Sequence, residues 1–417
     1  MRGRDRAESV GYVLALACAV AAPVLGRYAS LPFAALAAGD AVSRSRWPPD
    51  RYVGRGRQLT VFAAAAAGLA LAVAHYGLPF YLVTAPVALV VGAQALSAVR
   101  WTEGDRSGLS YLVGGGIAAS VAGAVTAGAV ESGVALAVAN GTVVAATARS
   151  VAGRDRPATV FVLGAAAMVA SSWLPATMTV SEIAAALLVT GALGAFAYSS
   201  GTMSADGTYG GVLLSFVTIV ASDYSWFLLL GLFVVLGAVW SRYREEEKVA
   251  MGVTEVGESR RGFSNVMANG GVALVGAVLW GVASSPGMET VASLLFAGGL
   301  AAATGDTLSS EIGSVHGEAR LITTLEHVPP GTDGGVSAVG ELVTVVGAAA
   351  FAVAAVGLGV VDPPGAVAVA IGGVVGTHVD SLLGATVEGP YVGNDAVNLL
   401  STTAGAVAAV AVAPYLL

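Results

Sequence analysis

The feature that most constrains this chain is a series of apolar runs that repeats from one end to the other. A helix that crosses the hydrocarbon core of a bilayer, roughly 30 Å thick, needs about 20 apolar residues. The runs are continuous rather than alternating, which favours helices over a transmembrane barrel. Only 11% of the 417 residues are charged, and the mean hydropathy is +0.77. The sequence therefore predicts an all-α fold, a polytopic transmembrane helical bundle of about 13 to 15 spans.

The candidate spans can be placed to within a few residues. They are expected near 9–26, 28–43, 58–75, 80–99, 109–128, 133–149, 157–173, 181–199, 209–222, 224–241, 264–283, 288–304, 338–361, 364–383 and 396–416.

Basic residues alternate between successive loops, and this alternation predicts the topology. With the N-terminus inside, the loops on the inner side hold nearly all the cations: Arg44, Arg46, Arg51, Arg55, Arg57, Arg100, Arg106, Arg149, Arg154, Arg156, Arg242, Arg244, Lys248, Arg260 and Arg261. The intervening loops 76–79, 129–132, 174–180, 284–287 and 362–363 contain no Lys or Arg, and Arg27 is the exception. Since positive charge marks the cytoplasmic side, we expect a multi-pass cell-membrane protein whose N-terminus and segment 305–337 face the cytoplasm.

Composition adds three constraints. Nineteen Arg against one Lys (Lys248), together with a net charge of −7, is typical of a high-salt, archaeal or halophilic source. The one cysteine, Cys18, excludes a disulfide or a cysteine-based metal site within the chain. Arg2, Arg4 and Arg6 precede the first apolar run, which is interpreted as a span rather than a signal peptide.

Polar residues divide the chain near residue 180. Region 1–180 consists of hairpins with basic loops and few polar residues inside spans, whereas region 181–417 contains nearly all the polar chemistry at membrane depth. No internal repeat is evident, so the symmetry typical of inverted-repeat transporters is not supported. We expect 1–180 to be an N-terminal scaffold or lipid-facing accessory of unknown role, and 181–417 to be the functional membrane region.

One polar stretch, 304–340, stands out between two apolar runs. Its first part holds Asp306, Ser309, Ser310 and Glu311, whose hard oxygen atoms suit a divalent cation near a helix end. The alternative is that Asp306 only caps a helix. Acidic and hydroxyl groups are costly at membrane depth, which favours the functional interpretation.

The second part of the stretch is a proline turn followed by a glycine-rich loop. Glycine frees backbone N–H groups, and a helix N-terminus after such a loop forms a concave anion site. The candidate phosphate-binding residues are Gly331, Thr332, Asp333, Gly334, Gly335 and Ser337. The alternative is a hairpin loop whose glycines only turn the chain.

Three further polar clusters are expected on the same membrane face. They are Arg260, Arg261, Asn265 and Asn269; His378, Asp380 and Ser381; and Glu388, Asn394, Asp395 and Asn398. Each has a structural explanation of its own, such as interhelical hydrogen bonding, helix capping or a topology signal. Their convergence on one face favours a shared site.

Four motifs in order over about residues 190–417 resemble a known integral-membrane family. They are RRGFSNVMANGGVA (Arg260 to Ala273), TGDTLSSEIG (Thr304 to Gly313), RLITTLEHVPPGTDGGVSAVG (Arg320 to Gly340), and GTHVDSLLGATVEG (Gly376 to Gly389) followed by NDAVN. The family is catalogued as "domain of unknown function 92" and includes transmembrane protein 19 of animals and the phytyl-phosphate kinase of plant vitamin E synthesis. The Gly-Asp-x6-Gly-x3-Gly pattern with its Gly-Thr loop is also similar to the nucleotide motif of dolichol and phytol kinases.

The chain departs from the family pattern at several positions. Asn265 and Glu388 each stand where Gln is usual, Gly305 stands where Ala is usual, and His378 lies in a motif that usually has Leu. A basic residue often precedes the Pro-Gly-Thr turn, and here Glu326 and His327 replace it, which leaves fewer fixed cations for a triphosphate than a kinase would ideally have.

The resemblance implies an isoprenyl-phosphate kinase that converts phytyl or geranylgeranyl phosphate to the diphosphate with CTP or another NTP and Mg²⁺. In this interpretation Asp306 and Asp380 hold the metal with help from Glu311, and Arg261 and Arg320 neutralise charge. The nucleotide is held by the residues of the glycine loop and by Asn269, Ser309 and Ser310. The expected partners are an isoprenyl phosphate lipid, a nucleotide and the membrane, and no nucleic acid. Alternatives are a polyprenol kinase or lipid cytidylyltransferase, a transporter of ions or small anions, and a structural or assembly protein.

Overall fold

The computed structural model describes residues 2–45, 58–97, 107–152, 156–174, 177–251, 260–316 and 318–416. The chain forms two compact units, unit 1 (Met1–Gly191) and unit 2 (Ala192–Leu417). The division lies within helix α9 (Val180–Ser199), whereas the expected division near residue 180 coincides with the start of that helix. The functional roles assigned to the two regions stay predictions.

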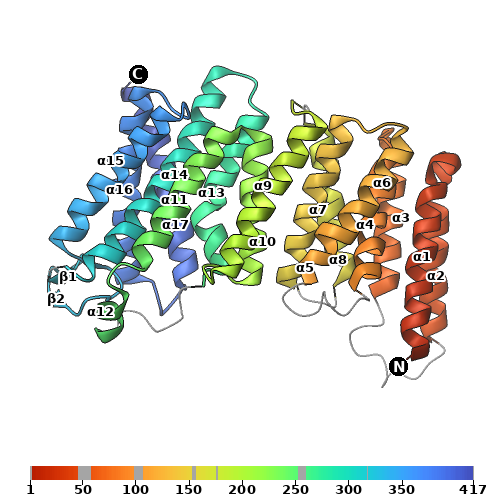
Figure 1. The fold of residues 1–417 in the computed structure, drawn as a ribbon, viewed down its shortest axis with the longest axis horizontal. Helices are drawn as coiled ribbons and strands as arrows, with labels where there is room; N and C mark the ends of the chain where they lie inside the picture. The colour runs from red at the N-terminus through yellow and green to blue at the C-terminus, as the bar shows by residue number, and fades with distance from the viewer. Residues whose placement is uncertain are drawn as a thin grey trace. The chain divides into compact units, whose positions relative to one another are not determined.

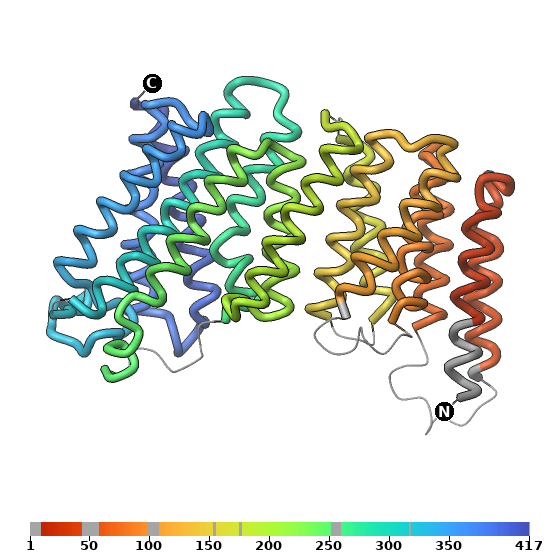
Figure 2. Tube along the Cα trace, viewed as in Figure 1, coloured from red at the N-terminus to blue at the C-terminus, as the bar shows by residue number. Residues whose placement is uncertain are grey.

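Unit 1 is a bundle of antiparallel helices, drawn from red to yellow in Figures 1 and 2. Its elements are α1 (Arg2–Leu25), η1 (Gly26–Tyr28), α2 (Ser30–Ser45), α3 (Gln58–Tyr76), α4 (Tyr81–Ser97), α5 (Ser107–Ser110), the π-helical turn η6 (Tyr111–Gly115), α6 (Gly116–Ala127), α7 (Ser132–Ala152) and α8 (Pro157–Ser172). Segment Gly108–Ala127, which runs through α5, η6 and α6, is one candidate span.

Unit 2 contains the second part of α9 and the elements that follow it. They are α10 (Ala205–Ala221), α11 (Tyr224–Ser241), α12 (Glu245–Ala250), α13 (Phe263–Gly281), α14 (Pro286–Gly313), β1 (Ala319–Leu321), β2 (His327–Val328), β3 (Gly335–Val336), α15 (Ala338–Gly357), α16 (Pro363–Thr386), α17 (Asn394–Val412) and η7 (Ala413–Tyr415). The long helices alternate in direction, so the last turns of α9, α11, α14 and α16 and the first turns of α10, α13, α15 and α17 share one end of the unit (Figure 1). We call this end the motif end.

The predicted fold class is confirmed. Within the described residues, 11 helices are long and apolar enough to cross a membrane, and three shorter apolar helices accompany them. Most predicted span boundaries agree with the helices to within a few residues. Several arginines of the topology prediction lie outside the described residues: Arg46, Arg51, Arg55, Arg57, Arg100, Arg106 and Arg154.

Helix α14 is the core of unit 2. It packs against α11, α13, α15, α16 and α17, and 78% of its most apolar window is buried. Helices α14, α16 and α17 approach closely because small residues meet between them. A Cβ atom on Gly405 would lie 2.8 Å from the carbonyl oxygen of Gly372, so only glycine permits this approach.

The predicted end of the span at residue 304 is wrong, because α14 continues for nine residues to Gly313. Gly305 does not break the helix. A Cβ atom there would lie 2.7 Å from the Thr377 hydroxyl, so this glycine allows α14 and α16 to approach each other. Asp306 and Glu311 therefore lie on the last turns of a packed helix and not in a loop.

The connection between α14 and α15 contains a three-stranded antiparallel sheet that the sequence did not predict. Its order is β2-β1-β3, with Arg320 opposite both His327 and Val336. The strands are two or three residues long, too short to show an alternating pattern. The sheet holds this connection over the motif end.

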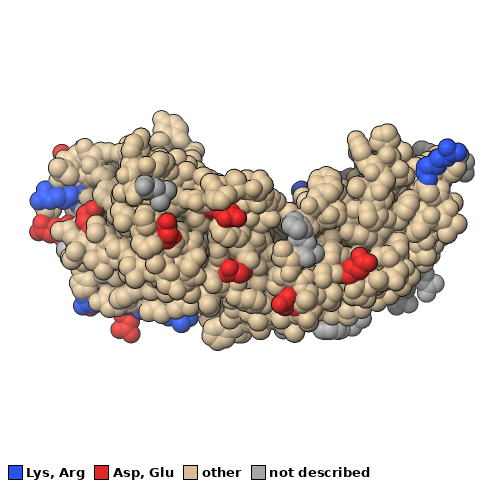
Figure 3. Space-filling model, turned by 90° about the horizontal axis from the view of Figure 1, so that it is seen from above, with Lys and Arg blue, Asp and Glu red and all other residues tan. Residues whose placement is uncertain are grey.

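Charged side chains are sparse on the face that carries the C-terminus. Seen from this side, acidic side chains are visible on each unit among mostly uncharged residues (Figure 3). The orientation relative to the cytoplasm stays a prediction.

Candidate functional site

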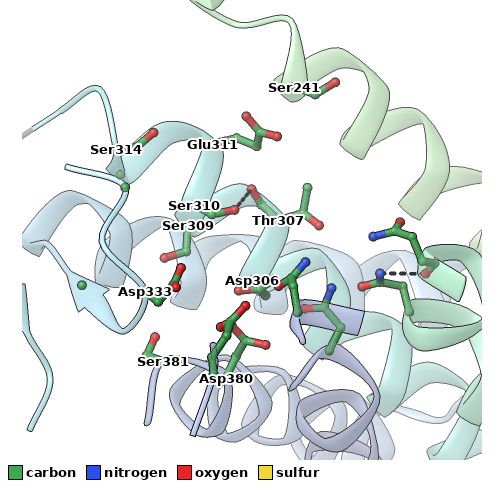
Figure 4. Close-up of a pocket in the computed structure, with 18 of the residues that line it drawn as sticks. Ser241, Asp306, Thr307, Ser309, Ser310, Glu311, Ser314, Asp333, Asp380 and Ser381 are labelled. Carbon is green, nitrogen blue, oxygen red and sulfur yellow. Dashed lines mark hydrogen bonds between the residues drawn. The ribbon is translucent and has the colours of Figure 1, made fainter. Parts of the chain in front are cut away.

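A polar cavity of about 550 Å³ opens at the motif end of unit 2. It brings together segments that are far apart in the sequence (Figure 4). Its lining consists of Thr202, Ala238, Ser241, Glu245, Arg260, Arg261, Gly262, Asn265, Asn269, Asp306, Thr307, Ser309, Ser310, Glu311, Gly313, Ser314, Ala319, Gly331 to Gly335, Ser337, Asp380, Ser381, Glu388, Asn394 and Asn398. Of the residues predicted for the metal, the nucleotide and charge neutralisation, all except Arg320 line this cavity. From the converging clusters, His378 and Asp395 do not line it, and His378 pairs instead with Glu341 at 3.0 Å.

Two carboxyl groups, those of Asp306 on α14 and Asp380 on α16, meet in the cavity wall (Figure 4). The close packing of the two helices at Gly305 and Thr377 places them there. Asp380 also interacts with the Ser401 hydroxyl, yet its Oδ1 atom is buried without a hydrogen-bond partner in the described part of the chain. Two carboxylates in contact repel each other, so this pair requires a proton or a cation between them.

The glycine loop brings a third carboxylate toward this pair. Gly334 adopts a φ of +74°, and a Cβ atom on it would lie 2.6 Å from the carbonyl oxygen of Ser381 on α16. The loop can therefore lie directly against α16, with Asp333 facing Asp380 and Glu388. Burial raises the pKa of Glu388, and the charges of Asp333 and Asp380 raise it further.

Most hydroxyl groups predicted to bind phosphate already have partners in the protein. Thr332 Oγ1 donates to the carbonyl of Pro329 at 2.7 Å, and Ser310 Oγ donates to that of Thr307 at 3.1 Å. Ser337 caps α15, since its Oγ accepts from the Gly340 N–H at 3.1 Å and donates to the Gly313 carbonyl at 3.3 Å. A hydroxyl has one proton to donate, so a phosphate would have to displace these bonds.

Glu311 has a different partner from the one that the sequence indicated. Its Oε2 lies 2.5 Å from the Nζ of Lys248, whose side chain is only 1% exposed. Lys248 also donates to the carbonyls of Trp240 and Ser241, at 3.2 and 3.4 Å, in the last turn of α11. All three ammonium protons thus have acceptors, and the pair joins α12, α11 and α14. A metal role for Glu311 would require its other oxygen or the loss of this pair.

The two predicted arginines lie in different places. The guanidinium of Arg261 packs against α11, within 3.0 Å of where a Cβ atom on Gly237 would stand, and it interacts with Glu311. Burial lowers the pKa of Arg261, and the charge of Glu311 opposes this shift. Arg320 lies outside the cavity on β1, where it donates to the Leu325 carbonyl at 2.9 Å and contacts His327 at 2.7 Å.

Sequence reasoning did not single out Lys248 as part of this site, and it named Arg260 only within a polar cluster and gave it no role of its own. Arg260 lines the cavity beside Arg261, and Lys248 holds one of its acidic residues. One signal was available for Lys248, since it is the single lysine in a chain that otherwise uses arginine. Its acceptors come from α11 and α14, and no local pattern links those two helices.

The donor atoms fit a magnesium ion held by two carboxylates. No three His, Cys, Asp or Glu side chains in the described ranges are arranged to share one metal ion. Mg²⁺ commonly uses only one or two carboxylates, with water and substrate phosphates as its other ligands. The unpartnered Oδ1 of Asp380 beside Asp306 meets that requirement.

Comparisons with known proteins give matches to the second half of the chain. The model of the family described as integral membrane protein DUF92 matches residues 188–406. The membrane protein MJ0933 of Methanocaldococcus jannaschii is 34% identical over 205 residues, 48% of this chain and 82% of that protein. The membrane protein sll0875 of Synechocystis is 29% identical over 203 residues, 48% of this chain and 78% of that protein.

A plant protein is similar over the same part. Protein VTE6, chloroplastic, of Arabidopsis thaliana is 30% identical over 224 residues, which cover 52% of this chain and 66% of the plant protein. No solved structure gives a significant match to the chain.

Proposed function

This chain belongs to the DUF92 family of integral membrane proteins, and from that premise we propose that unit 2 is a membrane-embedded isoprenyl-phosphate kinase. The substrate class is a phytyl or geranylgeranyl phosphate, and the phosphoryl donor is CTP or another NTP. One observation supports the proposal above all others, namely the meeting of Asp306 and Asp380 in a polar cavity at the ends of membrane spans.

The reaction needs positioning and charge neutralisation more than covalent chemistry. An oxygen of the isoprenyl phosphate forms a bond to the γ-phosphorus of the nucleotide, and the bond from that phosphorus to the β,γ-bridging oxygen breaks. The products are an isoprenyl diphosphate and a nucleoside diphosphate. The attacking oxygen is already anionic, so no general base is required.

The residues of the cavity have distinct proposed roles. Asp306 and Asp380 hold Mg²⁺, which neutralises phosphate charge when it is bound. Arg261 and its neighbour Arg260 supply positive charge, and Arg320 is left out because it lies outside the cavity. Glu311 acts through its pair with Lys248 rather than as a free ligand.

The proposed orientation places the cavity at the cytoplasmic surface. Arg260 and Arg261 precede α13 at the motif end, and Arg242 and Arg244 follow α11 at the same end. Basic residues beside spans favour the cytoplasmic side. A nucleotide from the cytoplasm then reaches the cavity without crossing the membrane.

The test is nucleotide turnover by the purified full chain in detergent. We expect Mg²⁺-dependent transfer of labelled γ-phosphate from CTP or ATP to geranylgeranyl phosphate, and none to geranylgeraniol. Transfer to the alcohol would indicate a polyprenol kinase, and release of diphosphate from CTP would indicate a cytidylyltransferase. Ion or anion flux in liposomes without nucleotide, combined with no transfer, would contradict the proposal.

A further inference from the structure

Two buried asparagines face the cavity from different helices. Asn269 on α13 is 9% exposed, Asn398 on α17 is 7% exposed, and both line the cavity. The helices are joined at this level, since Thr402 Oγ1 on α17 donates to the Ala268 carbonyl on α13 at 3.1 Å. The two amides therefore line the cavity from neighbouring helices that are bonded to each other.

The amide of Asn398 has no hydrogen-bond partner among the residues that the structure describes. Only its backbone carbonyl is used, as acceptor for Ser401 and Thr402. Asn269 Nδ2 donates to the Asn265 carbonyl at 3.0 Å, which leaves a second amide proton. The amide atoms of Asn398 are not fully enclosed, so they open onto the cavity, where a ligand can bond to them without displacing a protein partner.

Two features near these amides favour an anion, and they act against the carboxylates that also line the cavity and against Asp395 in the first turn of α17. Helices α13 and α17 begin after Gly262 and Gly393, and neither N-cap residue provides a side-chain cap. Uncapped N–H groups and the helix dipole make such ends attractive to negative charge, although Asp206 accepts from the Phe263 N–H at 3.0 Å. Arg260 and Arg261 line the same cavity directly before α13.

The distance of the two amides from the helix ends indicates whether they bind the phosphate of the lipid or a phosphate of the nucleotide. Asn269 lies six residues after Phe263 and Asn398 four after Asn394, so they stand about 9 Å and 6 Å along their helices. The glycine loop, in contrast, lies between β2 and β3 and contacts the last two turns of α16, at Ser381 and Ala385. A lipid phosphate joined to a chain within the membrane fits the deeper position, and a nucleotide from water fits the outer one.

We propose that Asn269 and Asn398 form the subsite for the phosphate of the isoprenyl phosphate, with the Asn398 amide donating directly to it. This inference rests on the proposed function and adds the position of the acceptor. The neutral amides bind the phosphate without adding negative charge beside Asp306 and Asp380. Asn398 is thus a substrate-binding residue that determines where the acceptor oxygen stands.

The experiment measures the binding of three probes to the purified full chain. They are geranylgeranyl phosphate, inorganic phosphate, and CTP with Mg²⁺. Asn398→Leu removes the amide at similar size, and we expect it to weaken binding of geranylgeranyl phosphate and inorganic phosphate at least tenfold, with CTP affinity within twofold of wild type. In a second variant, Asn398→Asp, the negative charge of the new carboxylate repels the phosphate. We again expect weaker binding of geranylgeranyl phosphate and inorganic phosphate, with CTP affinity close to wild type.

Asn140→Leu provides the matched control. Asn140 is a buried asparagine of a spanning helix in unit 1 and donates to Ser171 at 2.9 Å, so its replacement has a similar chemical effect away from the cavity. We expect this variant to keep wild-type affinity for all three probes.

The outcomes separate this inference from the proposed function. Selective loss of lipid-phosphate binding in a protein that transfers no phosphate would support the subsite and contradict the kinase. Three results in folded Asn398 variants would overturn the subsite, whatever the turnover. They are weaker binding of CTP alone, an equal loss of affinity for CTP and for geranylgeranyl phosphate, and no loss of affinity for any probe. A wild-type protein that binds neither geranylgeranyl phosphate nor inorganic phosphate would also overturn it.

Discussion

Helices α7 and α14 are both buried spans, yet they use their polar residues differently. In α7 of unit 1, 72% of the most apolar window is buried, close to the 78% of α14 in unit 2. Two polar side chains of α7 bond within the bundle, since Asn140 donates to Ser171 and Thr147 to the carbonyl of Val143. Those of α14 include Asp306 and Glu311, which face a cavity.

The difference shows that a buried span does not by itself indicate a site. A central helix of any bundle is surrounded by neighbours, and small or hydroxyl residues on it serve packing. A carboxylate that meets another carboxylate has no such structural use, because the pair costs free energy unless a cation or proton is present. The predictions below test whether this contrast between α7 and α14 holds.

The largest effect is expected at the two aspartates. Asp306→Asn and Asp380→Asn should each reduce nucleotide turnover on the order of 10²-fold or more, since each removes a proposed ligand of the metal. Melting temperature in detergent should stay near or above that of wild type, because a repulsive contact is relieved. Turnover and thermal unfolding are measured on the same preparations.

Asn140→Ala in α7 provides the reverse case. It should lower the melting temperature through its lost bond to Ser171 and leave turnover per folded molecule unchanged. If the Asp306→Asn variant unfolds, while the Asn140→Ala variant stays folded but loses turnover, the contrast between α7 and α14 is wrong.

The second prediction concerns the two ends of α14, where the expected result is all or none. In a Cys18→Ala background, a cysteine replacing exposed Thr324 beyond the motif end should be protected from an impermeant thiol reagent in intact cells and labelled in opened cells. A cysteine replacing exposed Ser285, at the other end of α14, should be labelled in intact cells. The opposite pattern would reverse the predicted orientation.

The third prediction concerns the ion pair that joins α12 to α14. Lys248→Met leaves Glu311 without its partner and should destabilise unit 2 by about 3 kcal/mol, the low end for buried pairs because a quarter of Glu311 remains exposed. The double variant Lys248→Met with Glu311→Gln should recover most of this loss. Thermal unfolding in detergent measures both, and an equally unstable double variant would show that the lysine acts mainly through the carbonyls of α11.

The smallest effects are expected at glycines with positive φ. Gly389 has a φ of +79° and no atom within 4 Å of an added Cβ, so Gly389→Ala should cost about 1 kcal/mol of backbone strain. Gly334 has a φ of +74° and lies against α16, so Gly334→Ala should cost clearly more. Equal melting shifts would mean that the glycine loop does not need its close contact with α16.

The architecture and part of the site follow from local sequence. Apolar runs predict spans because each helix must satisfy its own backbone in a bilayer, so length and hydropathy suffice. The end of α14 could not be predicted in this way, since Gly305 indicates a break unless Thr377 of α16 is known to pack against it. The short sheet escaped prediction for a different reason, because strands of two or three residues are too short to show an alternating pattern.

The sequence predicted which polar residues belong to the site, because such residues stand out in an apolar chain. It also predicted that they share one membrane face, because successive spans alternate in direction. The pairing of these groups was decided only by tertiary structure. The contact of Asp306 with Asp380, the capture of Glu311 by Lys248 and the unpartnered amide of Asn398 depend on distances between helices. The distances among α14, α16 and α17 depend on glycine and alanine contacts in the middle of these helices, such as Gly376 against Ala302, which no local pattern encodes.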